Sequence, residues 1–127
     1  MPCEKLTIFG TRRIVETLAR VATTGAAIMP IAGSTYTFSQ KNISRVSSNP
    51  GVYALFDGVE IIYYGSATKS IQDRLQDHFD GSAGPCTKGA TSYKRQEHNN
   101  PVAREKALLT EYQNSNGRLP RCNDVMP

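Results

Sequence analysis

Residues 51–64, with the sequence GVYALFDGVEIIYY, restrict the fold of this chain more than any other segment. Two runs rich in Val, Ile, Tyr and Phe lie on either side of Asp57 and Gly58. Such residues favour extended strands, and an Asp-Gly pair between two strand-like runs favours a tight turn. The segment therefore predicts a β-hairpin, and the turn-forming residues SSNPG just before it predict a domain boundary near Pro50.

The length of the hairpin loop decides whether Tyr53 and Tyr63 share one face of the sheet. Side chains alternate along a strand, and directly paired residues lie on the same face. A two-residue turn at Asp57 and Gly58 would put the two phenols on opposite faces and leave Tyr64 on the side of Tyr53. A three-residue loop would put Tyr53 and Tyr63 together, so both arrangements stay open at this point.

Apolar residues at helical spacing predict three amphipathic helices, over residues 11–21, 71–80 and 101–114. Ser70, with Asp73 three residues later, resembles a capping box at the start of the second helix. Asn100 and Pro101 supply an N-cap and a first-turn proline for the third. The chain therefore alternates helical and strand-like segments.

The remaining segments carry weaker signals. Ser39 predicts the start of a brief helix that runs through Val46, and residues 91–96 alternate enough to predict a third strand. The glycine-rich stretch 81–89 predicts a loop, and the tail RLPRCNDVMP predicts irregular structure.

The length of 127 residues predicts one compact domain with a short extension. No segment approaches the roughly 20 uninterrupted apolar residues that span a bilayer. The start, MPCEKLTIFGTRR, has no apolar run between a basic end and a small-residue cleavage site, so we expect no signal peptide. The sequence thus predicts a soluble, cytoplasmic protein without a membrane partner.

Cys3, Cys86 and Cys122 are odd in number and irregularly spaced, which argues against a disulfide framework. We therefore expect reduced thiols. The alternative is a zinc site made of Cys86, Cys122 and His98, but a free cysteine more often behaves as a small buried hydrophobe.

The net charge of +4 resides in the N-terminal part of the chain. Residues 1–49 hold six basic and two acidic side chains, whereas residues 50–127 hold nine of each. A basic segment can bind phosphates, and it can equally be a solvated helix face. We interpret residues 1–49 as a basic N-terminal extension.

Glu105 lies on the predicted apolar face of its helix, together with Leu108, Leu109 and Tyr112. Burying a carboxylate is costly, so this side chain needs an arginine, several donors or a metal ion to hold its charge. A hard divalent cation satisfies that need, and a structural pair with an interior arginine is the alternative.

Arg74 and His78 are four residues apart on the preceding helix and project from nearly the same side. A guanidinium can bind two phosphate oxygens, and an imidazole can move protons near neutral pH. Alternatively, Arg74 pairs with Asp73 or Asp77 and His78 only packs.

Taken in order, these positions resemble the GIY-YIG nuclease family over residues 50–123. Gly51-Val52-Tyr53 matches the first motif of the family, and Tyr63-Tyr64-Gly65 matches the second. The segments RLQDH at 74–78, EKALLTEY at 105–112 and PRCN at 120–123 follow in the order that the family has.

The resemblance implies an α/β (α+β) domain, assigned to residues 50–127, in which helices flank a small three-stranded antiparallel sheet. The N-terminal helical extension that precedes it is predicted from the residue pattern of residues 1–49. It also implies a divalent-metal-dependent endonuclease that uses Mg²⁺ or Mn²⁺ and acts on nucleic acid, with DNA favoured over RNA. The hairpin should then close with an odd-membered loop, so that both phenols face the site. The catalytic residues implied are Tyr53, Tyr63, Arg74, His78, Glu105 and Asn123.

Each of these residues receives a role from its position in the motifs. Glu105 would hold the metal ion, Arg74 the scissile phosphate, and Asn123 would support the tyrosines or the metal shell. Water activated by Tyr53 or His78 would attack in line and leave a 5′-phosphate and a 3′-hydroxyl. Departures from the family pattern are Val52, Tyr64 and Ser66, of which Ser66 stands where many relatives have a lysine.

We assign nucleic-acid binding to the basic residues Arg12, Arg13, Lys69, Lys88, Lys94 and Arg95. The competing hypothesis is a catalytically inactive nucleic-acid-binding module of the same fold. The sequence leaves open whether the protein forms a homo-oligomer.

Overall fold

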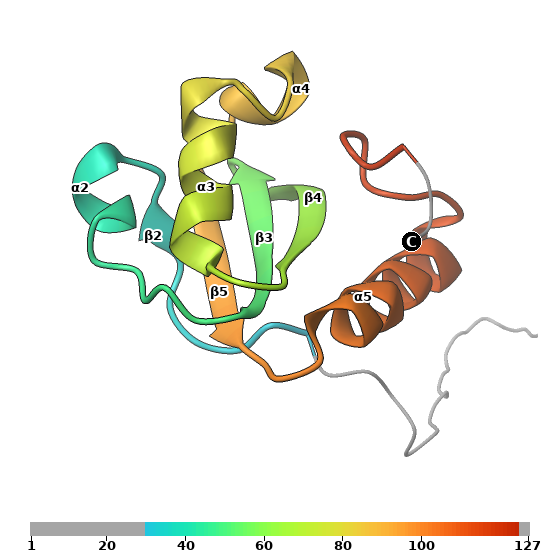
Figure 1. Ribbon diagram of the computed structural model, residues 1–127. Coiled ribbons are helices and arrows are strands. Elements are labelled where there is room, and N and C mark those ends of the chain that lie inside the picture. The colour runs from blue at the N-terminus through green and yellow to red at the C-terminus, as the bar shows by residue number, and fades with distance from the viewer. Residues whose placement is uncertain (1–29, 125–127) are drawn as a thin grey trace, which may run out of the picture.

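The computed structural model describes residues 30–124, and the structural statements below refer to these residues. Figure 1 shows one antiparallel sheet with helices on both sides, in the strand order β2-β5-β3-β4. The strands are β2 (Tyr36–Thr37), β3 (Gly51–Asp57), β4 (Glu60–Ala67) and β5 (Ser92–Glu97). The helices are α2 (Gln40–Ile43), α3 (Ile71–Asp80), α4 (Pro85–Lys88) and α5 (Pro101–Asn116). The predicted α/β class is confirmed, with β2 as an additional fourth strand.

The segment before Pro50 contributes to this fold. Tyr36 and Thr37 of β2 pair with β5, and Phe38 and Ile43 are buried in the core. The boundary near Pro50 stays a prediction, while residues 36–46 pack against β5 and in the core on the α3 side. The predicted helix over residues 11–21, together with Arg12, Arg13 and Cys3, lies outside the described residues.

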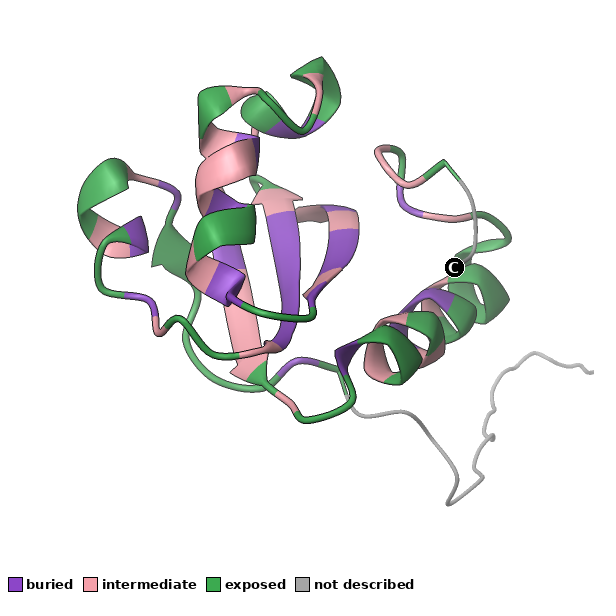
Figure 2. Ribbon diagram, in the orientation of Figure 1, coloured by how far each residue is buried: buried purple, intermediate pink, exposed green. Residues whose placement is uncertain are grey.

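The sheet separates two apolar cores, which Figure 2 shows as buried positions along the strands and on the inner sides of the helices. One core, on the α3 side, contains Tyr53, Leu55, Ile62, Ile71, Leu75 and Tyr93. The other, on the α5 side, contains Val52, Ala54, Tyr64, Leu108 and Leu109. Alternation along β3 sends Tyr53 and Val52 to opposite cores, so the two helices lie on opposite faces of the sheet.

The hairpin turn differs from both predicted alternatives. Asp57 pairs with Glu60, so the turn consists of the two residues Gly58 and Val59, and Gly58 adopts a left-handed φ of 63°. The register then shifts between Leu55 and Phe56, so that Ile62 is an extra residue in β4. The expected odd-membered loop is thus wrong, and a β-bulge makes the shift instead.

The bulge places Tyr53 and Tyr63 on one face of the sheet, as the odd-membered loop was expected to do. Leu55 pairs with Tyr63, and Tyr53 lies two residues from Leu55 on the same face. Without the bulge, the continued register would pair Tyr63 with Ala54 and send it to the opposite face. Tyr53 and Tyr63 therefore share the α3 face, while Tyr64 packs into the core under α5.

Local signals at the ends of α3 and α5 agree largely with the sequence. The Ser70 hydroxyl accepts a hydrogen bond from the Asp73 backbone N–H at 3.1 Å, and Gly81 ends α3. Asn100 and Pro101 begin α5, although the Asn100 side chain makes no cap hydrogen bond, and Gly117 ends it. None of the helices within residues 30–124 is long and apolar enough to cross a membrane.

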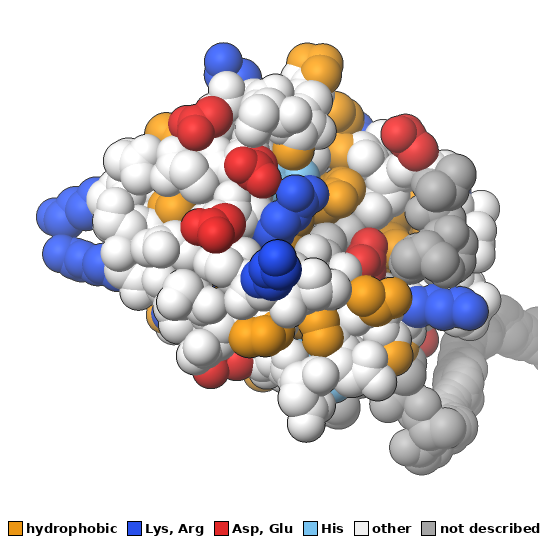
Figure 3. Space-filling view, in the orientation of Figure 1, with side chains coloured by type: hydrophobic (Ala, Val, Ile, Leu, Met, Phe, Trp, Pro, Cys, Tyr) orange, Lys and Arg blue, Asp and Glu red, His pale blue; other side chains and the backbone are white. Residues whose placement is uncertain are grey.

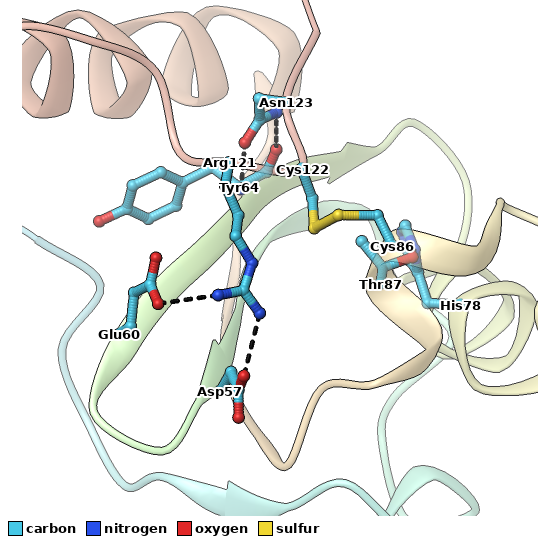
Figure 4. The surroundings of a disulfide bond; sticks show 9 residues. All are labelled: Asp57, Glu60, Tyr64, His78, Cys86, Thr87, Arg121, Cys122 and Asn123. Atoms are coloured by element: carbon cyan, nitrogen blue, oxygen red, sulfur yellow. Dashed lines mark hydrogen bonds and ion pairs between the residues drawn. A yellow bond between two sulfur atoms is a disulfide. The ribbon is translucent and has the colours of Figure 1, made fainter.

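The tail after α5 contacts the hairpin beside its turn and along the edge strand β4. Arg121 forms ion pairs with Asp57 and Glu60 at 2.9 and 3.0 Å, and these residues flank the hairpin turn (Figure 4). The Cys122 backbone N–H donates to the Ile62 carbonyl at 2.8 Å, so the tail continues the hydrogen bonding of the edge strand β4 at the bulge. The tail is irregular as predicted, but it is firmly attached.

A disulfide joins Cys86 of α4 to Cys122 of the tail, with Cα atoms 5.7 Å apart (Figure 4). The expectation of reduced thiols is wrong for this pair. The alternative zinc site is also wrong, because Cys86 and Cys122, its two sulfur ligands, are bonded to each other. Sequence spacing could not reveal the pair, because 36 residues separate the two cysteines. The cytoplasmic location stays a prediction, and this disulfide argues against it, since disulfides persist mainly in oxidising compartments.

Candidate active site

Tyr53 of β3 and His78 of α3 form the buried centre of the site. The Tyr53 hydroxyl oxygen lies 2.8 Å from His78 Nε2, and the other ring nitrogen, Nδ1, lies 2.7 Å from the Thr87 hydroxyl oxygen. His78 is only 1% exposed, and Tyr53 is fully buried. Both ring nitrogens of His78 are therefore occupied inside the protein.

Tyr63 of β4 completes an aromatic cluster with these two side chains. Its ring centroid lies 6.2 Å from that of Tyr53 and 4.9 Å from that of His78. Gly65 is paired directly with Tyr53, and a Cβ at this position would overlap both tyrosine rings. The absence of a side chain at Gly65 therefore leaves the space that the two rings occupy on this face.

Arg74 lies one helical turn before His78 and borders the cluster. Its positive charge is close enough to the Tyr53 hydroxyl to oppose the effect of burial, which raises the pKa of that phenol. It also pairs with Asp77 at 3.2 Å, with both side chains 45% exposed. On the face that carries α3, Figure 3 shows Lys and Arg side chains beside a histidine. The predicted surface pair exists, and it leaves Arg74 accessible to an anion from solvent.

Glu105 reaches the site from α5, on the other side of the edge strand. It shares a helix face with the buried Leu108 and Leu109, as predicted, and is itself half-buried. The Ser66 hydroxyl donates to Glu105 Oε1 at 2.5 Å. Burial raises the pKa of this carboxyl, and the hydrogen bond from Ser66 and then the charge of Arg74 oppose that effect.

The electrostatics of the cluster keep its buried groups neutral. Burial raises the pKa of Tyr53, with a further contribution from Tyr63. Burial and then the charge of Glu105 raise the pKa of Tyr63. Burial, followed by the charge of Arg74, lowers the pKa of His78 to about 4. At neutral pH the site therefore contains two phenols and a neutral imidazole between the charges of Arg74 and Glu105.

Asn123 binds the main chain of the hairpin instead of a side chain of the cluster. Its Oδ1 accepts from the Tyr64 backbone N–H and its Nδ2 donates to the Tyr64 carbonyl, both at 3.0 Å (Figure 4). Asn123 thus fixes β4 immediately after Tyr63, which fits the predicted supporting role through the backbone.

The residues predicted to bind nucleic acid are dispersed. Lys69 and Lys88 are exposed, the first just before α3 and the second at the end of α4. Lys94 and Arg95 are consecutive in β5 and therefore point to opposite faces of the sheet. Arg95 lies over the Tyr36 ring, 5.5 Å from its centroid, on the side of the sheet away from β4.

Two polar contacts of the site were not predicted. Ser66 was noted only as a departure from the family pattern, and its sequence position gave no indication that it would donate to Glu105. Thr87 lies in the segment predicted to be a loop, which instead forms α4. No periodicity or motif marks either contact, because both depend on tertiary structure.

The burial of His78 predicts a stability change with pH. The unfolded-state pKa of about 6.5 exceeds the folded-state value of about 4, so the unfolded chain binds the extra proton. The stabilisation is fully present above pH 6.5 and is lost as the pH falls toward 4. We expect His78 alone to lower the free energy of unfolding by roughly 3 kcal/mol between pH 7 and pH 4.

Denaturant unfolding of the parent and of His78→Gln over this pH range measures that contribution. Carboxylates titrate in both proteins, so the difference between the two pH curves isolates His78. His98→Gln, at a histidine outside the cluster, is the matched control for the loss of an imidazole. Parallel curves for the parent and His78→Gln would contradict the assignment.

The arrangement defines a GIY-YIG-like fold, which two solved structures share with a TM-score of 0.51 each. Both are the GIY-YIG N-terminal endonuclease domain of UvrC from Thermotoga maritima, at 21% and 20% identity. Each alignment covers 68% of this chain and 94% of the other. Each is a point mutant with phenylalanine in place of a tyrosine, bound to its catalytic divalent cation. By sequence, no family model and no curated protein matches the chain.

Proposed function

We propose that this protein is an endonuclease that hydrolyses phosphodiester bonds in nucleic acid, with DNA as its substrate and Mg²⁺ or Mn²⁺ as its cofactor. The observation that carries the proposal is the convergence of a neutral phenol–imidazole cluster, an accessible arginine and a half-buried carboxylate at one edge of the sheet. The GIY-YIG-like fold supports it, since both structural neighbours are endonuclease domains.

Glu105 fits a hydrated divalent cation. Its carboxylate is partly desolvated, and Ser66 is the only hydrogen-bond donor to it among residues 30–124. Within that range no three metal-binding side chains cluster, so the ion would be held by one carboxylate, water and substrate phosphate. Mg²⁺ commonly binds in this way. When bound, the cation supplies positive charge that stabilises the phosphate and the leaving oxygen.

Tyr53 is the group that we assign to the attacking water, with His78 as its proton acceptor. His78 accepts the proton through Tyr53, because both of its ring nitrogens are hydrogen-bonded to protein hydroxyl groups and Tyr53 is the partner of Nε2. Tyr53 takes a proton from the water while its own hydroxyl proton passes to His78 Nε2. Tyr53 then stays uncharged throughout, which suits a phenol whose pKa is raised by burial.

Arg74 binds the scissile phosphate in this proposal. A guanidinium matches two phosphate oxygens, and Arg74 is exposed next to Tyr53. In-line displacement then leaves a 5′-phosphate and a 3′-hydroxyl.

Contacts along the nucleic-acid backbone are assigned to the exposed Lys69 and Lys88, together with the basic residues of the N-terminal segment. Such contacts add affinity without base selectivity and weaken with salt. Lys94 and Arg95 cannot both take part, because they point to opposite faces of the sheet.

Incubation of the purified chain with supercoiled plasmid, linear duplex, single-stranded DNA and RNA, with Mg²⁺, Mn²⁺ or EDTA, tests the proposal. We expect nicked or linear plasmid with either metal and none with EDTA, and ends that ligase can rejoin. Binding without cleavage under every condition would identify an inactive nucleic-acid-binding module. If the chain neither binds nor cleaves any of these nucleic acids, the nuclease proposal is wrong.

A further inference from the structure

Thr87 provides a buried hydroxyl that the proposed chemistry does not use directly. The residue is 3% exposed and lies on α4, between Cys86 and Lys88. Its hydroxyl oxygen is 2.7 Å from His78 Nδ1, on the opposite side of the imidazole ring from Tyr53. His78 is therefore held between two hydroxyl groups, one from β3 and one from α4.

A neutral imidazole donates from one ring nitrogen and accepts at the other, so the two hydroxyl contacts are coupled. A phenol is a far stronger acid than an aliphatic alcohol and is the better donor to an imidazole nitrogen. His78 Nε2 is thus the acceptor, and Nδ1–H donates to Thr87.

The position of Thr87 is fixed from two directions. Its carbonyl accepts from the Ala90 backbone N–H at 3.1 Å, which closes the turn after α4. The neighbouring Cys86 is bonded to Cys122, whose backbone N–H is in turn bound to β4 at Ile62 (Figure 4). A helix of four residues has little rigidity of its own. The disulfide therefore connects α4 to the strand that carries Tyr63.

We infer that Thr87 is a positioning residue, whose hydroxyl accepts Nδ1–H of His78 and holds the imidazole in the tautomer in which Nε2 accepts the proton of Tyr53. The inference deepens the proposed function, on which its catalytic consequence rests. Thr87 meets neither substrate nor water in this role. It acts only through the orientation and protonation of His78.

Nitrogen-15 NMR of the histidine rings at pH 7, without substrate, tests the tautomer directly. The parent should show His78 with a protonated Nδ1 and an unprotonated Nε2. Thr87→Val keeps the side-chain shape but removes the acceptor, so Nδ1–H should no longer predominate. Thr87→Ser should restore the parent tautomer. Thr110→Val, at an exposed threonine of α5, is the matched control and should leave the His78 signals unchanged.

Cleavage rates provide the second measurement. Thr87→Val should lower kcat by roughly 10- to 100-fold, similar to the loss when the partner that orients a metal-binding histidine is removed. KM should be nearly unchanged, and Thr87→Ser should recover most of the loss. A parent in which Nε2 carries the proton, or a Thr87→Val protein with the parent tautomer, would overturn the inference. Because the NMR experiment needs no substrate, its result stands even if the parent cleaves nothing, which would count only against the proposed function.

Discussion

Glu105→Gln is expected to lower metal-dependent cleavage by roughly a thousandfold while the protein stays folded. The substitution keeps the size of the side chain and a carbonyl oxygen for the Ser66 hydroxyl, but removes the negative charge. A divalent cation contributes several kcal/mol of transition-state stabilisation, and each 1.36 kcal/mol corresponds to a factor of ten in rate. Plasmid nicking at saturating Mg²⁺ measures the loss, and thermal unfolding checks the fold.

Glu111→Gln is the matched control, because Glu111 lies on the same helix but is exposed. It should cleave at the parent rate. Removing this half-buried charge should also leave Glu105→Gln at least as stable as the parent, since burial raises the pKa of Glu105 and so disfavours its ionised form. A Glu105→Gln protein that cleaves at the parent rate would show that Glu105 does not hold the metal ion.

The hairpin illustrates how far the sequence predicts this site. The strand-forming residues indicated both strands, and the ordered motifs indicated that Tyr53 and Tyr63 share a face, which the structure shows. The structural feature that brings them to one face was not predictable from the sequence. A two-residue turn followed by a bulge at Ile62 has the same effect on register as a three-residue loop. Strand alternation requires one extra residue between Tyr53 and Tyr63 if both are to share a face, but it does not say where that residue lies.

Contacts between distant segments were the part that the sequence could not supply. Helical periodicity placed Glu105 on the same face as Leu108 and Leu109, and the structure agrees. The disulfide, by contrast, depends on α4 and the tail meeting beside β4, and no local pattern encodes that meeting. The contact of Thr87 with His78 depends on the same packing, which explains why the pair that orients the site was missed.

Arg74→Ala is expected to reduce kcat by about 100- to 1,000-fold, the usual loss when one preorganised donor to developing charge is removed. The effect on stability should be small, since the pair with Asp77 is largely exposed and worth at most about 1 kcal/mol. Binding of DNA should weaken less than turnover, because the contact tightens as charge accumulates on the phosphate. Single-turnover cleavage and a separate binding titration in Ca²⁺ measure the two quantities.

Asp77→Asn separates this role from the surface ion pair. It removes the partner of Arg74 while keeping the guanidinium, so cleavage should be equal to that of the parent or faster. Arg74→Lys retains the charge but not the planar two-point contact, and it should recover only part of the lost rate. Arg74→Ala should also raise the pKa of His78, because the charge of Arg74 adds to the lowering that burial causes. A histidine NMR titration detects that change independently of cleavage. If Arg74→Ala and Asp77→Asn had equal kcat, Arg74 would be a surface residue whose task is the ion pair.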